Sequence, residues 1–228
     1  MGDALTLGQV IKVTQTTNHV VGHDTPVVVN VPPVVSPTDN PPIATPPTPK
    51  PTGNKLTISD DDIVKAYSAV SGFDASTGLN DNGAVLLDVL NYWRTNGIAG
   101  HKIAAFTQLN PKNIKNIKAA IYLFGGIYVG VALPISAQKQ DIWDVPATGL
   151  TGDGAVGSWG GHAICATGYD TQYVYCISWG KTKKMTWAFW KAYVDEAYVV
   201  ISNDFATTKS PNGFDMSALL NDVQALSQ

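Results

Sequence analysis

The sequence predicts an α+β protein, with helices in the first half of its folded region and a mostly antiparallel sheet in the second. Three amphipathic stretches with capping residues lie between residues 57 and 126, and short apolar or alternating runs follow them. Ten of the 14 prolines fall between Pro26 and Pro51, ahead of both regions. A chain of 228 residues therefore fits one domain with appendages.

Composition divides the chain into four parts: an N-terminal segment over 1–25, a Pro-rich extended arm or linker over 26–55, a folded domain over 56–205, and a tail over 206–228. Residues 5–17 fit either a helix or a strand. The Pro-rich arm has no aromatic residue between Pro26 and Pro51, so it cannot form a hydrophobic core of its own. We expect it to be extended, with polyproline II character.

Capping residues bound the first two predicted helices. Ser59 is a typical N-cap, the aspartates at 60–62 complement the helix dipole, and Gly72 ends the helix. A second helix is expected over 82–96, because apolar residues recur there on one face and Gly97 follows.

A third helix is expected to begin with Asn110 as cap and Pro111 at its first position, and to end at Gly125. Strand patterns then take over. The expected strands are Ile127–Leu133, His162–Tyr169, Tyr173–Trp179 and Glu196–Ser202, and a short helix capped by Thr186 lies before the last of them over Trp187–Val194.

Composition argues against nucleic-acid and membrane partners. The net charge is −3, and no basic cluster is longer than Lys181–Lys184. The longest apolar run, Ala119–Ile135, contains glycines and a proline and is shorter than the ~20 residues that span a bilayer. The first eight residues hold no Lys or Arg, so no signal peptide is expected. Charged residues are only 14% of the chain, so the surface either consists largely of Thr, Asn, Ser, Gly and Pro or is covered by other chains.

Two short motifs stand out in the second half: the segment Ser158–Asp170, with its Gly-Gly-His-Ala core, and the later Ile177-Ser-Trp-Gly180. They resemble the His half of papain-like cysteine peptidases, family C1. Four further runs resemble C1-like proteins encoded in tailed phages and prophages. These are residues 80–84, 91–94, 122–126 and 185–190. The resemblance covers about 57–205 and implies a papain-like fold.

The resemblance also assigns catalytic positions. It implies that His162 occupies the place of the catalytic base, and that Ile177 stands where the family has an orienting Asn. Ser178 is expected on the opposite strand face from the imidazole. The nucleophile position falls on Ala4, in the opening Gly-Asp-Ala. We therefore expect these positions to be vestigial, with no functional catalytic residue, and the chain not to be an enzyme.

Other nucleophiles and ligands are weaker candidates. Cys165 and Cys176 lie in or beside the His strand and are expected to be buried apolar residues. His19 and His23 have helical i, i+4 spacing, but Gly22 between them disfavours a helix, so we expect no metal and no cofactor. The glycines of residues 149–154 lack the strand and helix of a phosphate-binding loop. The threonines at 6, 14, 16 and 17 lack an oriented base.

Three functional hypotheses remain. The favoured one is a catalytically silent papain-like domain acting as a structural or assembly protein, such as a decoration or head-associated component of a tailed-phage virion. Its location would be the virion if the chain is phage-encoded, and otherwise the cytoplasm. The alternatives are a module that binds a peptide or glycan in the old cleft, and an active cysteine-peptidase-like hydrolase.

The expected partners are other protein subunits. The arm over Pro26–Pro51 would contact them, with Val27–Val31 adding a strand to an exposed sheet edge. Asp215 would cap a C-terminal helix over 215–226, whose apolar stripe packs either on its own domain or on a neighbouring subunit.

Overall fold

The computed structural model describes residues 58–203 together with Asp215 and Ala218. Ala4, the histidines at 19 and 23, and the arm over 26–51 lie outside the described residues. Most of the expected C-terminal helix does too. At its start, the Asp215 Oδ1 accepts a hydrogen bond of 3.1 Å from the Ala218 backbone N–H, as a helix cap does.

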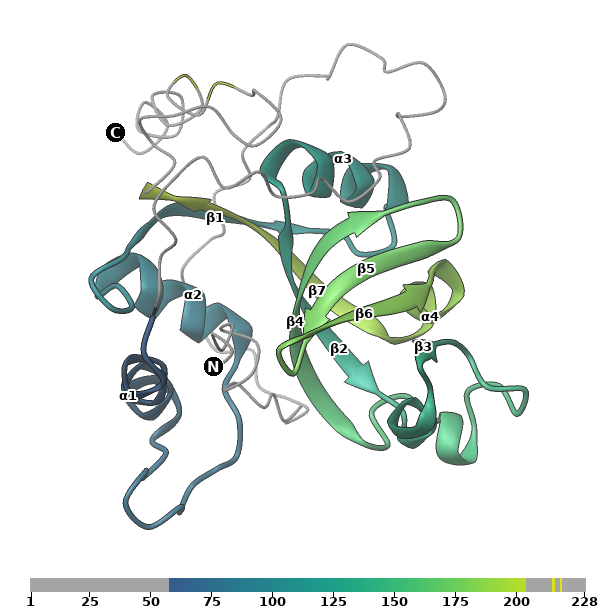
Figure 1. Ribbon diagram of the computed structural model, residues 1–228, viewed down its shortest axis with the longest axis horizontal. Helices are drawn as coiled ribbons and strands as arrows, with labels where there is room; N and C mark the ends of the chain where they lie inside the picture. Colours follow the sequence, from purple (N-terminus) through teal and green to yellow (C-terminus); the bar gives the residue numbers. More distant parts are fainter. Residues whose placement is uncertain (1–57, 204–214, 216–217, 219–228) are drawn as a thin grey trace, which may run out of the picture.

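A seven-stranded sheet forms the centre of the described structure, with strand order β1-β7-β2-β4-β5-β6-β3 (Figure 1). All neighbouring pairs are antiparallel except β3 and β6. The strands are β1 Ile103–Leu109, β2 Ile127–Leu133, β3 Ile142–Trp143, β4 Gly160–Tyr169, β5 Tyr173–Ser178, β6 Lys181–Thr186 and β7 Val194–Ser202. The α-helices are α1 Asp60–Ser71, α2 Leu86–Thr95, α3 Ile114–Phe124 and α4 Trp187–Tyr193. Two short 3₁₀ turns lie between β2 and β4, at Ile135–Lys139 and Gly152–Gly154. The α+β class is therefore confirmed.

Capping chemistry places the helix ends. The Ser59 side chain accepts from the Asp62 N–H, and Gly72 ends α1 in the left-handed conformation, as expected. Thr186 caps α4 in the same way through the Phe189 N–H. The second and third helices begin later than expected, at Leu86 and Ile114.

The order of elements departs from the expectation in one place. All four expected strands are present, but β1, β3 and β6 were not expected, and β1 lies between α2 and α3. The helices therefore do not all precede the sheet. In β6 the three lysines hide the strand pattern, because this strand is largely exposed.

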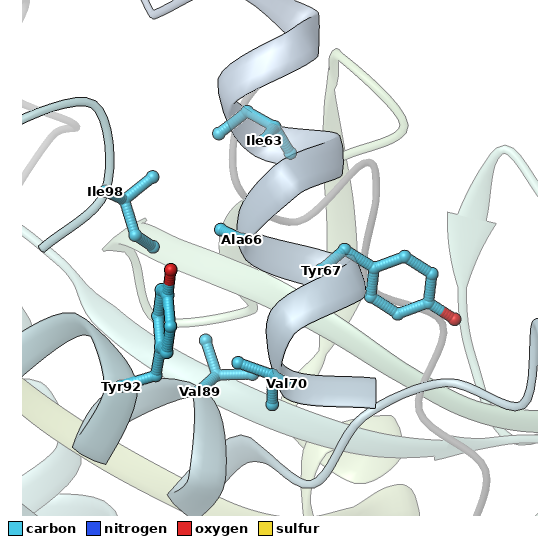
Figure 2. A pocket seen from close by; sticks show the side chains of 7 residues that line it. All are labelled: Ile63, Ala66, Tyr67, Val70, Val89, Tyr92 and Ile98. Atoms are coloured by element: carbon cyan, nitrogen blue, oxygen red, sulfur yellow. The ribbon is translucent and has the colours of Figure 1, made fainter. Parts of the chain in front are cut away.

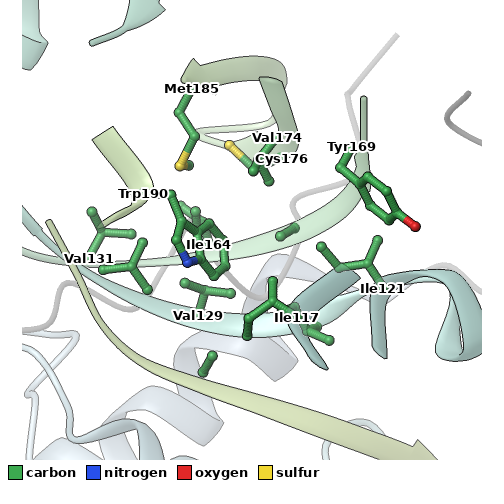
Figure 3. Close-up of a cluster of buried hydrophobic side chains, with 14 of the residues drawn as sticks. Ile117, Ile121, Val129, Val131, Ile164, Tyr169, Val174, Cys176, Met185 and Trp190 are labelled. Carbon is green, nitrogen blue, oxygen red and sulfur yellow. The ribbon is translucent and has the colours of Figure 1, made fainter. Parts of the chain in front are cut away.

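The central strand β2 is buried on both faces. Val129 and Val131 point into the larger core, which α3 and α4 cover and which Figure 3 shows around Trp190 and Met185. Tyr128 points into a second core, where Leu86 and Leu90 of α2 pack on the other face. The sheet is therefore held between α2 on one side and α3 and α4 on the other.

Helix α1 packs on α2 rather than on the sheet, at the left of Figure 1. A narrow apolar hollow lies between the two helices, and Figure 2 shows its lining, which is Ile63, Ala66, Tyr67, Val70, Val89, Tyr92 and Ile98. The Tyr67 hydroxyl points away from the hollow and donates to Asp81 at 2.7 Å. Apart from the Tyr92 hydroxyl, the lining is apolar, so the hollow offers little for orienting a polar ligand. Within the described ranges, no helix combines the length and apolarity that crossing a bilayer requires.

Candidate functional site

The site forms around His162, near the start of β4. The His162 Nε2 lies 2.9 Å from the Ser178 Oγ at the end of β5, and both side chains are buried, with 4% and 3% of their surface exposed. Cys165 of β4 pairs with Ile177 of β5, so Ser178 lies on the same sheet face as Ile164 and His162. The expectation that Ser178 faces away from the imidazole is therefore wrong.

Ile177, the position assigned to the orienting group, makes no such contact. It is half-buried and alternates with the buried residues on either side, so it lies on the opposite face of β5 from Ser178. The resemblance placed the orienting group one residue too early. The hydroxyl of Ser178 is the group that fixes the imidazole.

Tryptophans surround this pair. The Trp179 ring stacks on the His162 ring with centroids 4.1 Å apart and planes 16° apart. Trp143 meets the imidazole edge-on at 6.5 Å and is fully buried. Trp159 packs against Trp179 at 5.3 Å with a tilt of 31°. The imidazole is thus covered by aromatic rings, and the outer two rings reach solvent.

A tight turn holds Trp179 in place. Ser178 pairs with Lys181, so Trp179 and Gly180 form a two-residue turn between β5 and β6. Both have positive φ, 46° and 69°, which a type I′ turn requires. A tryptophan at φ 46° costs of order 1 kcal/mol, because its Cβ crowds the following carbonyl. The ring stacking on His162 and the twist of the hairpin offset this strain.

Burial controls the charge of the imidazole. Desolvation lowers the pKa of His162 from 6.5 to about 4. The ring is therefore neutral near pH 7, and one nitrogen is anchored on Ser178. A neutral imidazole of this kind accepts or donates one further hydrogen bond through its other nitrogen.

Neither cysteine forms a nucleophile with this histidine. Cys165 lies three residues along β4 on the opposite face, and Cys176 is buried in the larger core beside Met185 (Figure 3). Burial raises the pKa of the Cys165 thiol to about 11 and that of Cys176 to about 12. Both thiols are protonated near neutral pH, and the reactive form of a cysteine is the thiolate.

Sequence reasoning found His162 but missed its surroundings. The sequence placed Trp179 inside the expected strand Tyr173–Trp179, because the lysine-rich run after it was not recognised as the second strand of a hairpin. Trp143 lies in the two-residue strand β3 and Trp159 in the loop before β4, and neither segment is long or regular enough to show a periodic pattern in the sequence. Across the described residues, no group of three or more His, Cys, Asp or Glu side chains gathers into a possible metal site.

Comparisons with known proteins add one distant structural likeness. No family model matches the chain, and no curated protein matches it either. Among solved structures, a match is found to the cysteine protease CMS1MS2 of Carica candamarcensis in complex with E-64, with 14% identity and a TM-score of 0.42. The match covers 63% of this chain and 82% of that one.

This comparison corrects one expectation. The sequence led us to expect that the chain is not an enzyme, whereas the matched solved structure is that of a cysteine protease. The expectation is overturned by this finding and is withdrawn.

Proposed function

We propose that the chain works in a protein assembly and binds another polypeptide at the surface that Trp159 and Trp179 form. We call these two side chains the tryptophan surface. The observation that carries the proposal is their exposure: two adjacent tryptophans leave 37% and 45% of their surface to solvent. Exposed, adjacent aromatic side chains are typical of interaction sites, because they bury much area at low entropic cost.

The support beneath the tryptophan surface favours binding. Trp179 rests on the buried His162, and Ser178 holds the His162 ring. A side chain fixed in this way loses little conformational freedom when a partner binds, so more of the contact energy appears as affinity.

The rim of the tryptophan surface favours a polypeptide over a glycan. The segment 156–159 runs beside the end of β2, since the Gly157 N–H donates to the Ala132 carbonyl and the Trp159 N–H to the Leu133 carbonyl. Val156 of this segment and the nearby Ile135 are exposed. Sugar recognition needs polar groups around the aromatic rings, whereas apolar neighbours match the side chains of a peptide.

The proposal extends to the setting of the assembly. The motifs that resemble phage and prophage C1-like proteins support a structural role in a tailed-phage virion, as a decoration or head-associated protein. In that setting the Pro26–Pro51 arm and the helix over 215–226 are the proposed contacts with neighbouring subunits.

Selection from a displayed library of random dodecapeptides tests the binding function. We expect peptides enriched on the full chain to lose at least tenfold in affinity for the Trp179→Ala and Trp159→Ala variants. Tyr122→Ala is the matched control, because Tyr122 is an exposed aromatic residue on α3 with 38% of its surface free. Enriched peptides that bind both tryptophan variants as tightly as the parent chain would contradict the proposal.

A further inference from the structure

The tryptophan surface is an exposed pair of aromatic side chains that can contact a proline-rich ligand. Its two rings lie 5.3 Å apart with a tilt of 31°, and they leave 37% and 45% of their surface exposed. Grooves lined by aromatic rings bind polyproline II segments, because proline rings pack on the aromatic faces and the ligand is already extended before it binds. Little conformational entropy is then lost on docking.

The chain itself carries such a ligand. The run Pro46-Pro-Thr-Pro-Lys-Pro51 lies at the end of the proline-rich stretch. In a polyproline II helix three residues complete a turn, so Pro46 and Pro49 lie on one ridge about 9 Å apart. Residues 26–51 contain only two charged side chains, Asp39 and Lys50, which suits a neutral apolar surface.

A short stretch of chain joins the run to the described structure. Pro51 is seven residues before Ile58, the first described residue, and that length spans up to about 25 Å. Ile58 packs at the α1 end of the molecule. In Figure 1 the turn between β5 and β6 is at the left end of this hairpin, and α1 and α2 lie at the left of the same view.

We infer that the proline run of residues 46–51 docks on the tryptophan surface. The inference rests on the proposed function, since it names a partner for the same surface. The chain then regulates its own binding site: external peptides compete with the proline run, and an assembly partner displaces it.

Fluorine NMR of the full chain labelled with 5-fluorotryptophan tests the contact. The chain has six tryptophans, and single Trp→Phe variants assign their resonances. The test variant carries Pro46→Ala, Pro47→Ala and Pro49→Ala, and the matched control carries Pro26→Ala, Pro32→Ala and Pro33→Ala. We expect the Trp159 and Trp179 resonances to shift in the test variant alone. A synthetic peptide of residues 44–51 added to that variant should return them to their original positions.

Other results would overturn the inference. These are unchanged Trp159 and Trp179 resonances in the test variant, equal shifts in the control, or shifts confined to other tryptophans. The library selection separates this failure from that of the proposed function. If selected peptides bind the tryptophan surface but the Trp159 and Trp179 resonances do not shift in the test variant, the surface binds partners and only the self-docking is wrong. If the run docks but no external peptide binds even the test variant, the proposed function is wrong.

Discussion

At the scale of single residues, the site depends on an uncharged imidazole. His162 is buried against Trp143 and Trp179, and its one anchoring contact is the Ser178 hydroxyl. Protonation would place a charge among aromatic rings, and within residues 58–203 burial is the cause that disfavours it. The charge state of His162 therefore couples the site to the stability of the fold.

We expect acid to destabilise the protein through this residue. The pKa of His162 is about 4 in the folded chain and near 6.5 when unfolded, so between these values the unfolded state binds more protons. The stabilisation is complete above pH 6.5 and is lost as the pH falls to 4, by about 3 kcal/mol for a shift of this size. Urea unfolding at pH 7 and pH 4.5 measures it.

The His162→Gln variant is the control for this prediction, because glutamine has no proton to gain. The difference in unfolding free energy between the parent chain and this variant should shrink as the pH falls. Glu196 titrates in the opposite sense, since burial raises its pKa, and it is common to both proteins. A difference that does not change with pH would contradict the prediction.

At the residue scale, the sequence was enough to predict the histidine of the site but not the residue that contacts it. A Gly-Gly-His start to an apolar run was enough to single out His162. The choice between Ile177 and Ser178 depends on strand register, and a slip of one residue exchanges the two faces. Register is set by the pairing of Cys165 with Ile177, which the sequence does not reveal.

At the scale of elements, local chemistry made the helices and the central strands predictable. Ser59, Gly72, Gly125 and Thr186 end or begin helices for reasons confined to a few neighbouring residues. The edge strand β3 and its neighbour β6 escaped prediction, because β3 has two residues and β6 is largely exposed and carries three lysines. Their pairing comes from distant partners and not from their own pattern.

The pairing of β2 with β7 yields a second prediction. Gly130 lies opposite Glu196, and a methyl group at Gly130 would lie 2.6 Å from the Glu196 Cγ. We expect Gly130→Ala to lower the free energy of unfolding by about 1–3 kcal/mol, because this strand is buried on both faces and the overlap forces a shift.

A double-mutant cycle checks that the cause is this contact. A Glu196→Ala background removes the two nearest contacts of the new methyl group and leaves the Asp195 Oδ1 at 3.1 Å, so the Gly130→Ala change should cost less there, as measured by urea unfolding. Equal costs in both backgrounds would show that the overlap with Glu196 is not the reason.

At the scale of the whole molecule, the helical part and the sheet share a core. Leu86 and Leu90 of α2 pack with residues from β1, β2, β4 and β7, including Tyr128 and Tyr198. Helix α1 joins through its contact with α2. The described chain therefore has no boundary at which one part could unfold without exposing the apolar surface of the other.

The Leu86→Ala variant tests whether the helices and the sheet unfold together. Leu86 is fully buried where α2 meets the sheet, so its truncation should cost about 2–5 kcal/mol in unfolding free energy. Because the core is shared, Trp93 on α2 and Trp190 in the larger core should lose their native fluorine signals at one urea concentration, lower than in the parent chain. A matched Leu79→Ala change, at an exposed loop position, should leave the free energy of unfolding within about 0.5 kcal/mol of the parent value. If Trp93 unfolds first while Trp190 stays native, the helices form a separate unit. The tryptophan surface would then belong to a sheet that is stable without them.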